Sequence, residues 1–204
     1  MLRKQRSLRS KANKESVVFY RICWSLFSFI EKLYWFFKRK VQMQQFIACG
    51  KDVFISRGCY FSNNTITLGS DVYIGQNCRF QSTNSKIFIG NHVMFGPNVS
   101  IHGGNHRTDL VGRYMKSVRL DEKTPADDVD VVIGNDVWVG ANAIILKGVN
   151  IGEGSVVGAG SVINQDIPPY NIVVGSKSQK VFERWGNREI KEHLKIINGD
   201  EQIG

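Results

Sequence analysis

From residue 53 onward, the chain alternates short apolar pairs with turn-forming residues at a regular interval. Each pair consists of two apolar or small residues separated by one position, and Gly follows the second member in nine of fifteen pairs. The second member advances by six residues at most steps, as in the series 133, 139, 145, 151, 157 and 163. The pairs are Val53/Ile55, Cys59/Phe61, Ile66/Leu68, Val72/Ile74, Cys78/Phe80, Ile87/Ile89, Val93/Phe95, Val99/Ile101, Val131/Ile133, Val137/Val139, Ala143/Ile145, Val149/Ile151, Ser155/Val157, Ser161/Ile163 and Ile172/Val174.

This six-residue period predicts short strands joined by tight corners. A helix would need an apolar period near 3.6, and a strand of an ordinary sheet would alternate over a longer run. Two side chains that are two positions apart point to the same side of a strand, and the Gly, Asn and Asp residues that follow tolerate a sharp bend. Three such sides close a triangular coil, so the fifteen pairs predict about five coils stacked around an apolar interior.

Residues 1–48 lack this period and predict an amphipathic helical arm. Between residues 17 and 37, Arg21, Ser25, Ser28 and Lys32 recur every three or four positions, and mostly aromatic and aliphatic residues fill the rest. On a helix, these four polar residues form one narrow stripe. Two interpretations stay open. The helix lies in a membrane interface, where its basic residues meet anionic lipid, or it packs on the body or on a partner subunit.

The net charge of the chain is concentrated in this arm. Residues 1–40 hold 11 basic and 2 acidic side chains, a net charge of +9, whereas residues 41–204 hold 16 of each sign. A neutral body argues against a nucleic-acid-binding protein, for which a basic face is expected. The longest uncharged run in the arm is residues 22–30, so we expect neither a cleaved signal peptide nor a membrane-spanning helix. These features favour a cytoplasmic protein, with peripheral contact to the inner face of a membrane through residues 1–40 as one of the two open interpretations.

The four cysteines give no sign of a metal site or a disulfide framework. Cys23, Cys49, Cys59 and Cys78 are scattered, without a C-x-x-C motif or a close Cys/His cluster. Cys59 and Cys78 fall on inward positions of the repeat, where a thiol packs as a small hydrophobic group. We therefore expect no bound metal.

The run IGNDVWVGANAIILKGVNIGEGSVVGAGSVI carries the repeat in a very regular form. It resembles the hexapeptide-repeat acyltransferases, and the resemblance covers about residues 53–185. The resemblance implies a mainly β fold, with a left-handed parallel β-helix over residues 49–181, which is a known exception to the right-handed crossover rule. It further implies an acetyl-CoA-dependent O-acetyltransferase that acts on a sugar, polysaccharide or lipid-linked glycan hydroxyl, and a homotrimer with sites between subunits.

Two interruptions of the repeat are candidate functional features. Nine residues in place of six separate Phe80 from Ile89, and thirty-two separate Ile101 from Ile133. A long excursion from a regular repeat is usually functional or flexible, which makes residues 102–131 the candidate catalytic loop. The segment PNVSIHGGNHRTD, residues 97–109, resembles the site loop of the xenobiotic and sugar acetyltransferases in this superfamily.

By that resemblance, His106 is the catalytic general base, which takes the proton of an acceptor hydroxyl as the hydroxyl attacks the thioester of acetyl-CoA. His102 follows the inward Ile101 directly and is the weaker candidate for this role. The residues expected at the acceptor are His102, Asn105, Arg107 and Asp109. A carboxylate could orient the imidazole of His106, and the candidates that stay open are Asp109, Asp127, Asp128 and Asp130.

The resemblance places the coenzyme along the later coils. Trp138 alternates with inward residues and therefore points outward, where it meets a neighbouring subunit or a ligand. The segments DVWVG and GAGS match the family's coenzyme-binding coils. The ending GSKSQKV differs from the family's usual Gly-x-Pro-Ala-Lys-Val, so Lys177 and Lys180 both stay candidates for a phosphate contact. The implied coenzyme-binding residues are Trp138, Gly140, Ala141, Ala159, Lys177 and Lys180.

Residues 182–197 predict a short amphipathic helix within a C-terminal segment, 182–204. Two functional alternatives stay open. The first is a γ-class carbonic anhydrase-like protein, in which His92, His102 and His106 would bind zinc, although the intact DVWVG segment fits this class poorly. The second is a non-catalytic β-helical scaffold with a membrane arm.

Overall fold

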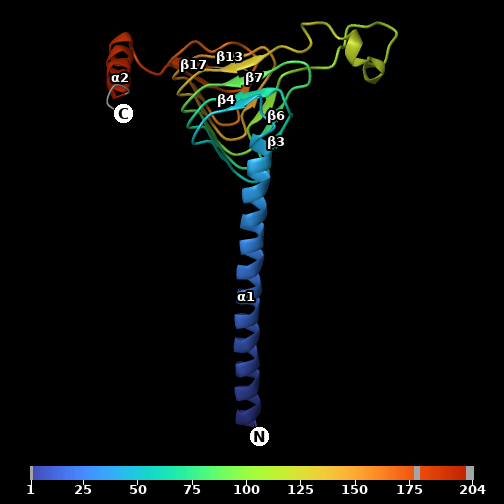
Figure 1. The fold of residues 1–204 in the computed structure, drawn as a ribbon, viewed down its shortest axis with the longest axis vertical. Coiled ribbons are helices and arrows are strands. Elements are labelled where there is room, and N and C mark those ends of the chain that lie inside the picture. Colours follow the sequence, from blue (N-terminus) through green and yellow to red (C-terminus); the bar gives the residue numbers. More distant parts are fainter. Residues whose placement is uncertain (1, 177–179, 201–204) are drawn as a thin grey trace. The chain divides into compact units, whose positions relative to one another are not determined.

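The computed structural model of the chain describes residues 2–176 and 180–200 and divides into two units. The first unit ends at Gln44 and consists of one helix, α1 (Leu2–Met43). The second unit begins at Gln45 and contains all the strands and the remaining helices (Figure 1). In the described part of the chain, no helix is long and apolar enough to cross a membrane.

The second unit is built mainly from three parallel sheets that the chain enters in rotation. Every third strand returns the chain to the sheet where it started, one layer further along. Five three-sided coils result, which confirms the predicted left-handed parallel β-helix. Sheet A contains β1 (Ala48–Cys49), β4 (Ile66–Leu68), β7 (Ile87–Ile89), β10 (Val131–Ile133) and β13 (Asn150–Ile151). Sheet B contains β2 (Phe54–Ile55), β5 (Tyr73–Ile74), β8 (Met94–Phe95), β11 (Trp138–Val139), β14 (Val156–Val157), β16 (Asn171–Val174) and β17 (Lys180–Glu183). Sheet C contains β3 (Tyr60–Phe61), β6 (Arg79–Gln81), β9 (Ser100–His102), β12 (Ile144–Ile145) and β15 (Val162–Ile163).

The interior of the coils is a column of apolar side chains, as the paired pattern predicts. Nearly all inward positions are buried, and the larger ones stack on their neighbours in adjacent coils. The rings of Phe46, Phe61, Phe80 and Phe95 form a continuous series with centroid distances of 5.3, 5.3 and 5.0 Å. Because a single coil has nothing to cover this surface, the coils stabilise one another by stacking.

The corners between strands use left-handed backbone conformations. Among the described residues, nine that are not glycine have φ angles between +52° and +59°, and seven of these are Asn or Asp, which tolerate this conformation best after Gly. Successive coils also approach closely at the corners. A Cβ atom added to Gly140 would lie 2.6 Å from the backbone nitrogen of Ala159, so this position in the stack admits no side chain.

Two expectations for the C-terminal part are wrong by small shifts. The last pair was expected to point inward through Ile172 and Val174, but the structure buries Val173 in their place. The reason is that β16 pairs in parallel with β14, where Val173 lies opposite the inward Val157, so the six-residue step runs from the buried Ile167 to Val173. On its other side, β16 pairs with β17 in antiparallel fashion. This pairing also occupies Lys180–Glu183, so the last helix, α2 (Asn187–Asp200), begins later than residue 182.

Both interruptions of the repeat leave the β-helix at the same edge. The first joins β6 to β7 and the second joins β9 to β10, so both run from sheet C to sheet A in adjacent coils. The second excursion contains two short 3-10 helices, η1 (Met115–Ser117) and η2 (Leu120–Glu122). Figure 1 shows these helices, in yellow-green, at the outer end of the excursion and away from the stacked strands. The edge between sheets C and A therefore carries the irregular structure that a site needs.

Candidate active site

The two excursions contact each other where they leave the edge between sheets C and A. The hydroxyl of Ser85 donates to the carbonyl oxygen of Gly103 at 2.6 Å, and the Asn84 amide donates to Asp128 at 2.8 Å. The backbone N–H of Lys86 donates to Asp130 at 2.7 Å. These contacts anchor both ends of the long second excursion on the short first one.

A pocket of about 450 Å³ lies at this junction. One side is formed by the end of β6 and the residues after it, another by the end of β9 and the start of the second excursion, and a third by the segment around η2. The pocket is lined by Gln81, Ser82, Thr83, His102, Gly104, Asn105, His106, Arg107, Val118, Arg119, Leu120, Lys123 and Asp128. The lining thus combines hydroxyl, amide, imidazole and charged groups with two apolar side chains.

The structure brings four of the five residues expected at the reacting groups together in this pocket. His102, Asn105, His106 and Arg107 all line it, whereas Asp109 does not. The side chain of His106 is exposed to solvent, and its imidazole makes no hydrogen bond to the residues that the structure describes. Its ring nitrogens are therefore available to a substrate.

None of the four carboxylates considered as partners of His106 contacts its imidazole. Each is occupied by another group, and these bonds hold the excursion in shape. Asp109 accepts from Arg107, Asp127 from the backbone N–H and hydroxyl of Thr124, Asp128 from Lys123 and Asn84, and Asp130 from the backbone N–H of Lys86. The expectation that one of them orients His106 finds no support in this arrangement.

His102 has a more enclosed environment than His106. It is half-buried at the end of β9, in register with Gln81 on β6. Burial lowers the pKa of His102, and the positive charge of Arg79 lowers it further, because both disfavour the imidazolium form. His102 is therefore neutral at neutral pH, and in that state one ring nitrogen donates a hydrogen bond and the other accepts one.

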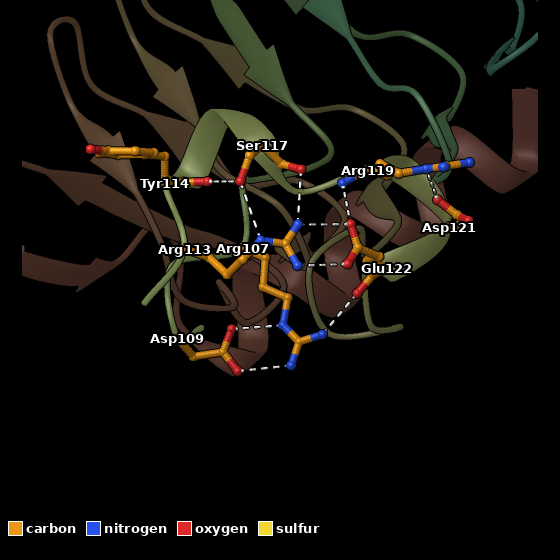
Figure 2. A network of polar contacts seen from close by, with 8 residues as sticks. All are labelled: Arg107, Asp109, Arg113, Tyr114, Ser117, Arg119, Asp121 and Glu122. Carbon is orange, nitrogen blue, oxygen red and sulfur yellow. Dashed lines mark hydrogen bonds and ion pairs between the residues drawn. The ribbon is translucent and has the colours of Figure 1, made fainter. Parts of the chain in front are cut away.

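Arg107 holds the segment that carries His106. Figure 2 shows its guanidinium bound to Asp109 by two parallel bonds, of 2.7 Å from Nε and 3.1 Å from Nη2. Its Nη1 donates to the carbonyl oxygen of Glu122 at 2.8 Å, which links the start of the excursion to η2. The Arg107 guanidinium also holds the pKa of Asp109 below its ordinary value. Arg107 and Asp109, both expected at the acceptor, thus form a bridge across the loop.

The same network continues around η1 and η2. The guanidinium of Arg113 binds both carboxylate oxygens of Glu122 and the carbonyl oxygen of Ser117, and lowers the pKa of Glu122 (Figure 2). The Glu122 carboxylate also accepts from the backbone N–H of Arg119 at 2.8 Å. This pattern of bonds between residues 107 and 122 gives the exposed excursion a defined fold without a core of its own.

A buried ion pair fixes the return of the excursion to the β-helix. Lys123 Nζ lies 2.7 and 2.8 Å from the two carboxylate oxygens of Asp128, and the side chains are only 13% and 6% exposed. Lys123 and the pocket residues Gln81, Ser82 and Thr83 were not among the residues expected at the site. The sequence does hold a signal for these residues. The two interruptions begin after Phe80 and Ile101, which are 21 residues apart and occupy the same side of adjacent coils, so the two excursions start next to each other.

The residues expected at the coenzyme lie on a different edge of the same chain. Trp138, on sheet B, is 51% exposed. Gly140 and Ala141 form the following corner towards sheet C, and Ala159 lies at the same corner one coil further on, where the backbones touch. Lys180 is exposed on β17, and Lys177 lies outside the described residues.

The three imidazoles considered for zinc do not meet. His102 and His106 line the pocket, but His92 lies at the corner between sheets A and B, where its Nδ1 is 2.8 Å from Asp71. Within residues 2–176 and 180–200, no group of three or more His, Cys, Asp or Glu side chains is arranged to hold a metal ion.

Comparison with known proteins finds related sequences along most of the second unit. Residues 130–165 match the family described as bacterial transferase hexapeptide (six repeats). A galactoside O-acetyltransferase of Lactococcus lactis subsp. lactis is 36% identical over 161 residues, which cover 76% of this chain and 64% of that protein. A chloramphenicol acetyltransferase of Klebsiella aerogenes is 34% identical over 121 residues, which cover 54% of this chain and 58% of that protein. The chain thus spans 58 to 64% of the length of these two curated relatives.

A solved structure of similar fold contains a bound coenzyme. It is a hexapeptide-repeat acetyltransferase from Vibrio cholerae O1 biovar eltor in complex with acetyl coenzyme A. Its sequence is 30% identical, the TM-score is 0.59, and the match covers 71% of this chain and 74% of that chain.

Proposed function

Since the chain belongs to the family of hexapeptide-repeat acetyltransferases, we propose that it transfers an acetyl group from acetyl-CoA to a hydroxyl group of a sugar or glycan. The observation that carries this proposal is the position of His106. Its unpaired imidazole lines a polar pocket at the one edge of the β-helix where two excursions from adjacent coils meet. The galactoside O-acetyltransferase relative supports a sugar as the acceptor.

In the proposed reaction, His106 acts as general base. Its neutral imidazole accepts the proton of the acceptor hydroxyl while the hydroxyl oxygen attacks the carbonyl carbon of the thioester. The tetrahedral intermediate then collapses, the carbon–sulfur bond breaks, and coenzyme A leaves after the thiolate takes up the proton. The products are the acetyl ester of the acceptor and free coenzyme A. Base catalysis of this kind contributes about 10²–10⁴-fold to the rate.

Among the remaining pocket residues, neutral His102 and Asn105 are proposed to bind the acceptor hydroxyls. Each offers both a donor and an acceptor, as a hydroxyl group requires. Arg107 and Asp109 are proposed to act on the acceptor indirectly, through the shape of the loop that they bridge. Trp138, Gly140, Ala141 and Ala159 are proposed to contact acetyl-CoA, with Lys180 or Lys177 at its phosphates.

A homotrimer is part of the proposal because one chain does not complete the site. The pocket lies on the edge between sheets C and A, and the proposed coenzyme residues lie on the edge between sheets B and C. A second copy can supply the second edge to the first, and a contact of this head-to-tail kind closes after three copies if each turns by one third of a circle. Acceptor and coenzyme would then meet between neighbouring subunits.

The outer surface of sheet B supports such a contact. Its outward side chains follow one another in register through six strands and are all apolar or aromatic: Phe54, Tyr73, Met94, Trp138, Val156 and Ile172. The rings of Phe54 and Tyr73 stack with a centroid distance of 5.4 Å. A continuous apolar ladder on an exposed face is typical of a surface between subunits. We further propose a cytoplasmic enzyme whose arm contacts the membrane.

The test compares two histidines after the same substitution. The release of coenzyme A from acetyl-CoA is measured with a galactoside, maltose, a lipid-linked glycan and chloramphenicol as acceptors. His106→Asn is expected to lower kcat by about 10²–10⁴-fold, whereas His92→Asn, at a corner outside the pocket, is expected to leave it unchanged. Circular dichroism verifies that both variants keep the β-helix.

Three results would overturn the proposal. Full activity of the folded His106→Asn variant would show that His106 is not the general base. Exclusive acetylation of chloramphenicol would show that the acceptor is an antibiotic and not a sugar. If the wild-type chain transfers acetyl to none of these acceptors, the proposed activity itself is contradicted.

A further inference from the structure

The helix α1 presents an apolar surface of unusual width and aromatic content. Nine of the 21 residues from 17 to 37 are Phe, Tyr or Trp. One face is centred on Leu26 and its side chains are between 46% and 63% exposed in α1: Phe19, Ile22, Leu26, Ile30, Leu33 and Phe37. These positions follow one another at intervals of three or four residues, so they form one continuous helical face. We call these six residues the apolar face.

A narrow polar stripe runs along the other side of the same helix. It consists of Arg21, Ser25, Ser28 and Lys32, again at intervals of three or four residues. Near the C-terminal end, Lys38 places its ammonium group 4.8 Å from the ring centroid of Trp35 and 5.6 Å from that of Tyr34. Such a cation over aromatic rings suits the boundary between an apolar phase and water.

The composition of the arm favours a lipid surface as the partner of the apolar face. A coiled-coil seam occupies only two positions of each heptad, whereas the exposed rings of Tyr20, Trp24 and Phe27 extend the apolar surface of α1 well beyond the apolar face. Helices that lie in a membrane interface combine large aromatic residues on one side with Lys and Arg on the other. The first 40 residues carry a net charge of +9, which complements the negative surface of anionic phospholipids, while the rest of the chain is neutral.

We propose that α1 lies in the plane of a membrane that contains anionic phospholipids, with its apolar face in the acyl-chain region and its polar stripe towards the water. In this proposal the helix enters one leaflet only. Since α1 is covalently linked to the body, the proposed enzyme is confined to the membrane surface. As a deepening that rests on the proposed function, this confinement raises the local concentration of lipid-linked acceptors.

The test uses two substitutions that introduce the same side chain at positions two residues apart. The full-length chain is sedimented with vesicles of phosphatidylcholine plus phosphatidylglycerol, and with vesicles of phosphatidylcholine alone. The wild-type chain is expected to bind the anionic vesicles more strongly. Leu26→Lys puts a charge in the centre of the apolar face and is expected to lower partitioning by about tenfold or more. Ser28→Lys adds the same charge to the polar stripe and is expected to maintain or increase binding.

The salt dependence of binding and the particle mass distinguish the proposed insertion from adsorption by charge alone and from a bundle of α1 helices. Raising the salt concentration shortens the range of charge attraction, so binding should weaken but persist when the apolar face is inserted. Equal effects of Leu26→Lys and Ser28→Lys would overturn the proposal in favour of adsorption by charge alone. A change of particle mass by Leu26→Lys in solution, with no vesicle binding by the wild-type chain, would overturn it in favour of a bundle of α1 helices.

The outcome is independent of the proposed acetyl transfer. Release of coenzyme A with a water-soluble galactoside is measured in both variants and is expected to stay within twofold of the wild-type value, since neither residue lies in the pocket. Loss of vesicle binding by the wild-type chain with intact turnover contradicts only the membrane contact. Vesicle binding without turnover contradicts only the proposed function.

Discussion

At the scale of single residues, the pocket separates two imidazoles by environment. His106 is exposed at the start of the long excursion, whereas His102 is half-buried on β9 and has a lowered pKa. A general base must reach a substrate proton, and a binding residue must keep a fixed charge state. The exposed imidazole suits the first task, and the enclosed neutral imidazole suits the second.

The lowered pKa of His102 predicts how the stability of the folded chain changes with pH. Because the folded chain binds this proton more weakly than the unfolded chain, the unfolded state takes it up first as the pH falls. His102 therefore contributes stability above its ordinary pKa of 6.5, and this contribution is lost as the pH falls from there towards the lowered value. Urea unfolding between about pH 7.5 and about pH 5 should show this loss, and His102→Gln should reduce it. An unchanged pH dependence in the variant would contradict the assignment.

The role of single residues was only partly predictable. His106 and His102 could be proposed from the sequence because one motif contains both and because both lie near the end of a strand that the repeat fixes. The bridge formed by Arg107 was not found, because its partner carbonyl on Glu122 lies 15 residues away across an irregular loop. Contacts of this kind depend on how the loop folds back, and no period in the sequence specifies that path.

At the scale of elements, the long excursion depends on its anchors. Its outer part has no buried side chains in η1 or η2 and is held by polar bonds. The ion pair of Lys123 with Asp128 is the exception, because both side chains are largely buried in the wall of the pocket. A buried pair of this kind is sensitive to the loss of one partner, which leaves the other charge without compensation.

We predict that removing one member of this ion pair destabilises the excursion more than removing both. Asp128→Asn leaves the ammonium group of Lys123 buried without its counter-charge and should lower the stability of the excursion by about 3 kcal/mol. The double variant Lys123→Met with Asp128→Leu restores apolar packing and should recover part of that loss. Limited proteolysis and hydrogen exchange of residues 103–130 measure the effect. Equal protection from proteolysis and hydrogen exchange in the single and double variants would contradict this prediction.

The regular elements were predictable wherever the six-residue pattern of one strand and one corner recurs along the sequence. A pair of inward side chains and a corner that allows positive φ define each side of the coil, so five coils followed from the sequence. The prediction was off by one residue at β16, because the buried Ile167, from which a six-residue step leads to Val173, was not among the predicted inward residues. The strand β17 was not predicted, because all four of its side chains are exposed and no alternation of buried and exposed positions marks it.

At the scale of the whole molecule, the separation of the two edges is the basis of the proposed trimer. Sheet C lies between the edge that carries the pocket and the edge that carries Ala141 and Ala159. A rigid stack of coils cannot fold one edge onto the other. The chain therefore reaches its proposed activity only in an assembly, and the activity should depend on the integrity of the contact between subunits.

A matched pair of substitutions tests which face makes that contact. Met94, in the middle of the apolar ladder on sheet B, is 52% exposed, and Val132, on the outer surface of sheet A, is 39% exposed. Met94→Glu would bury an unpaired carboxylate in the proposed contact, so we predict dissociation of the trimer and loss of acetyl transfer at the same protein concentrations. Val132→Glu should leave both unchanged. Light scattering gives the mass, and an active monomer, or a trimer that survives Met94→Glu, would contradict the proposed arrangement.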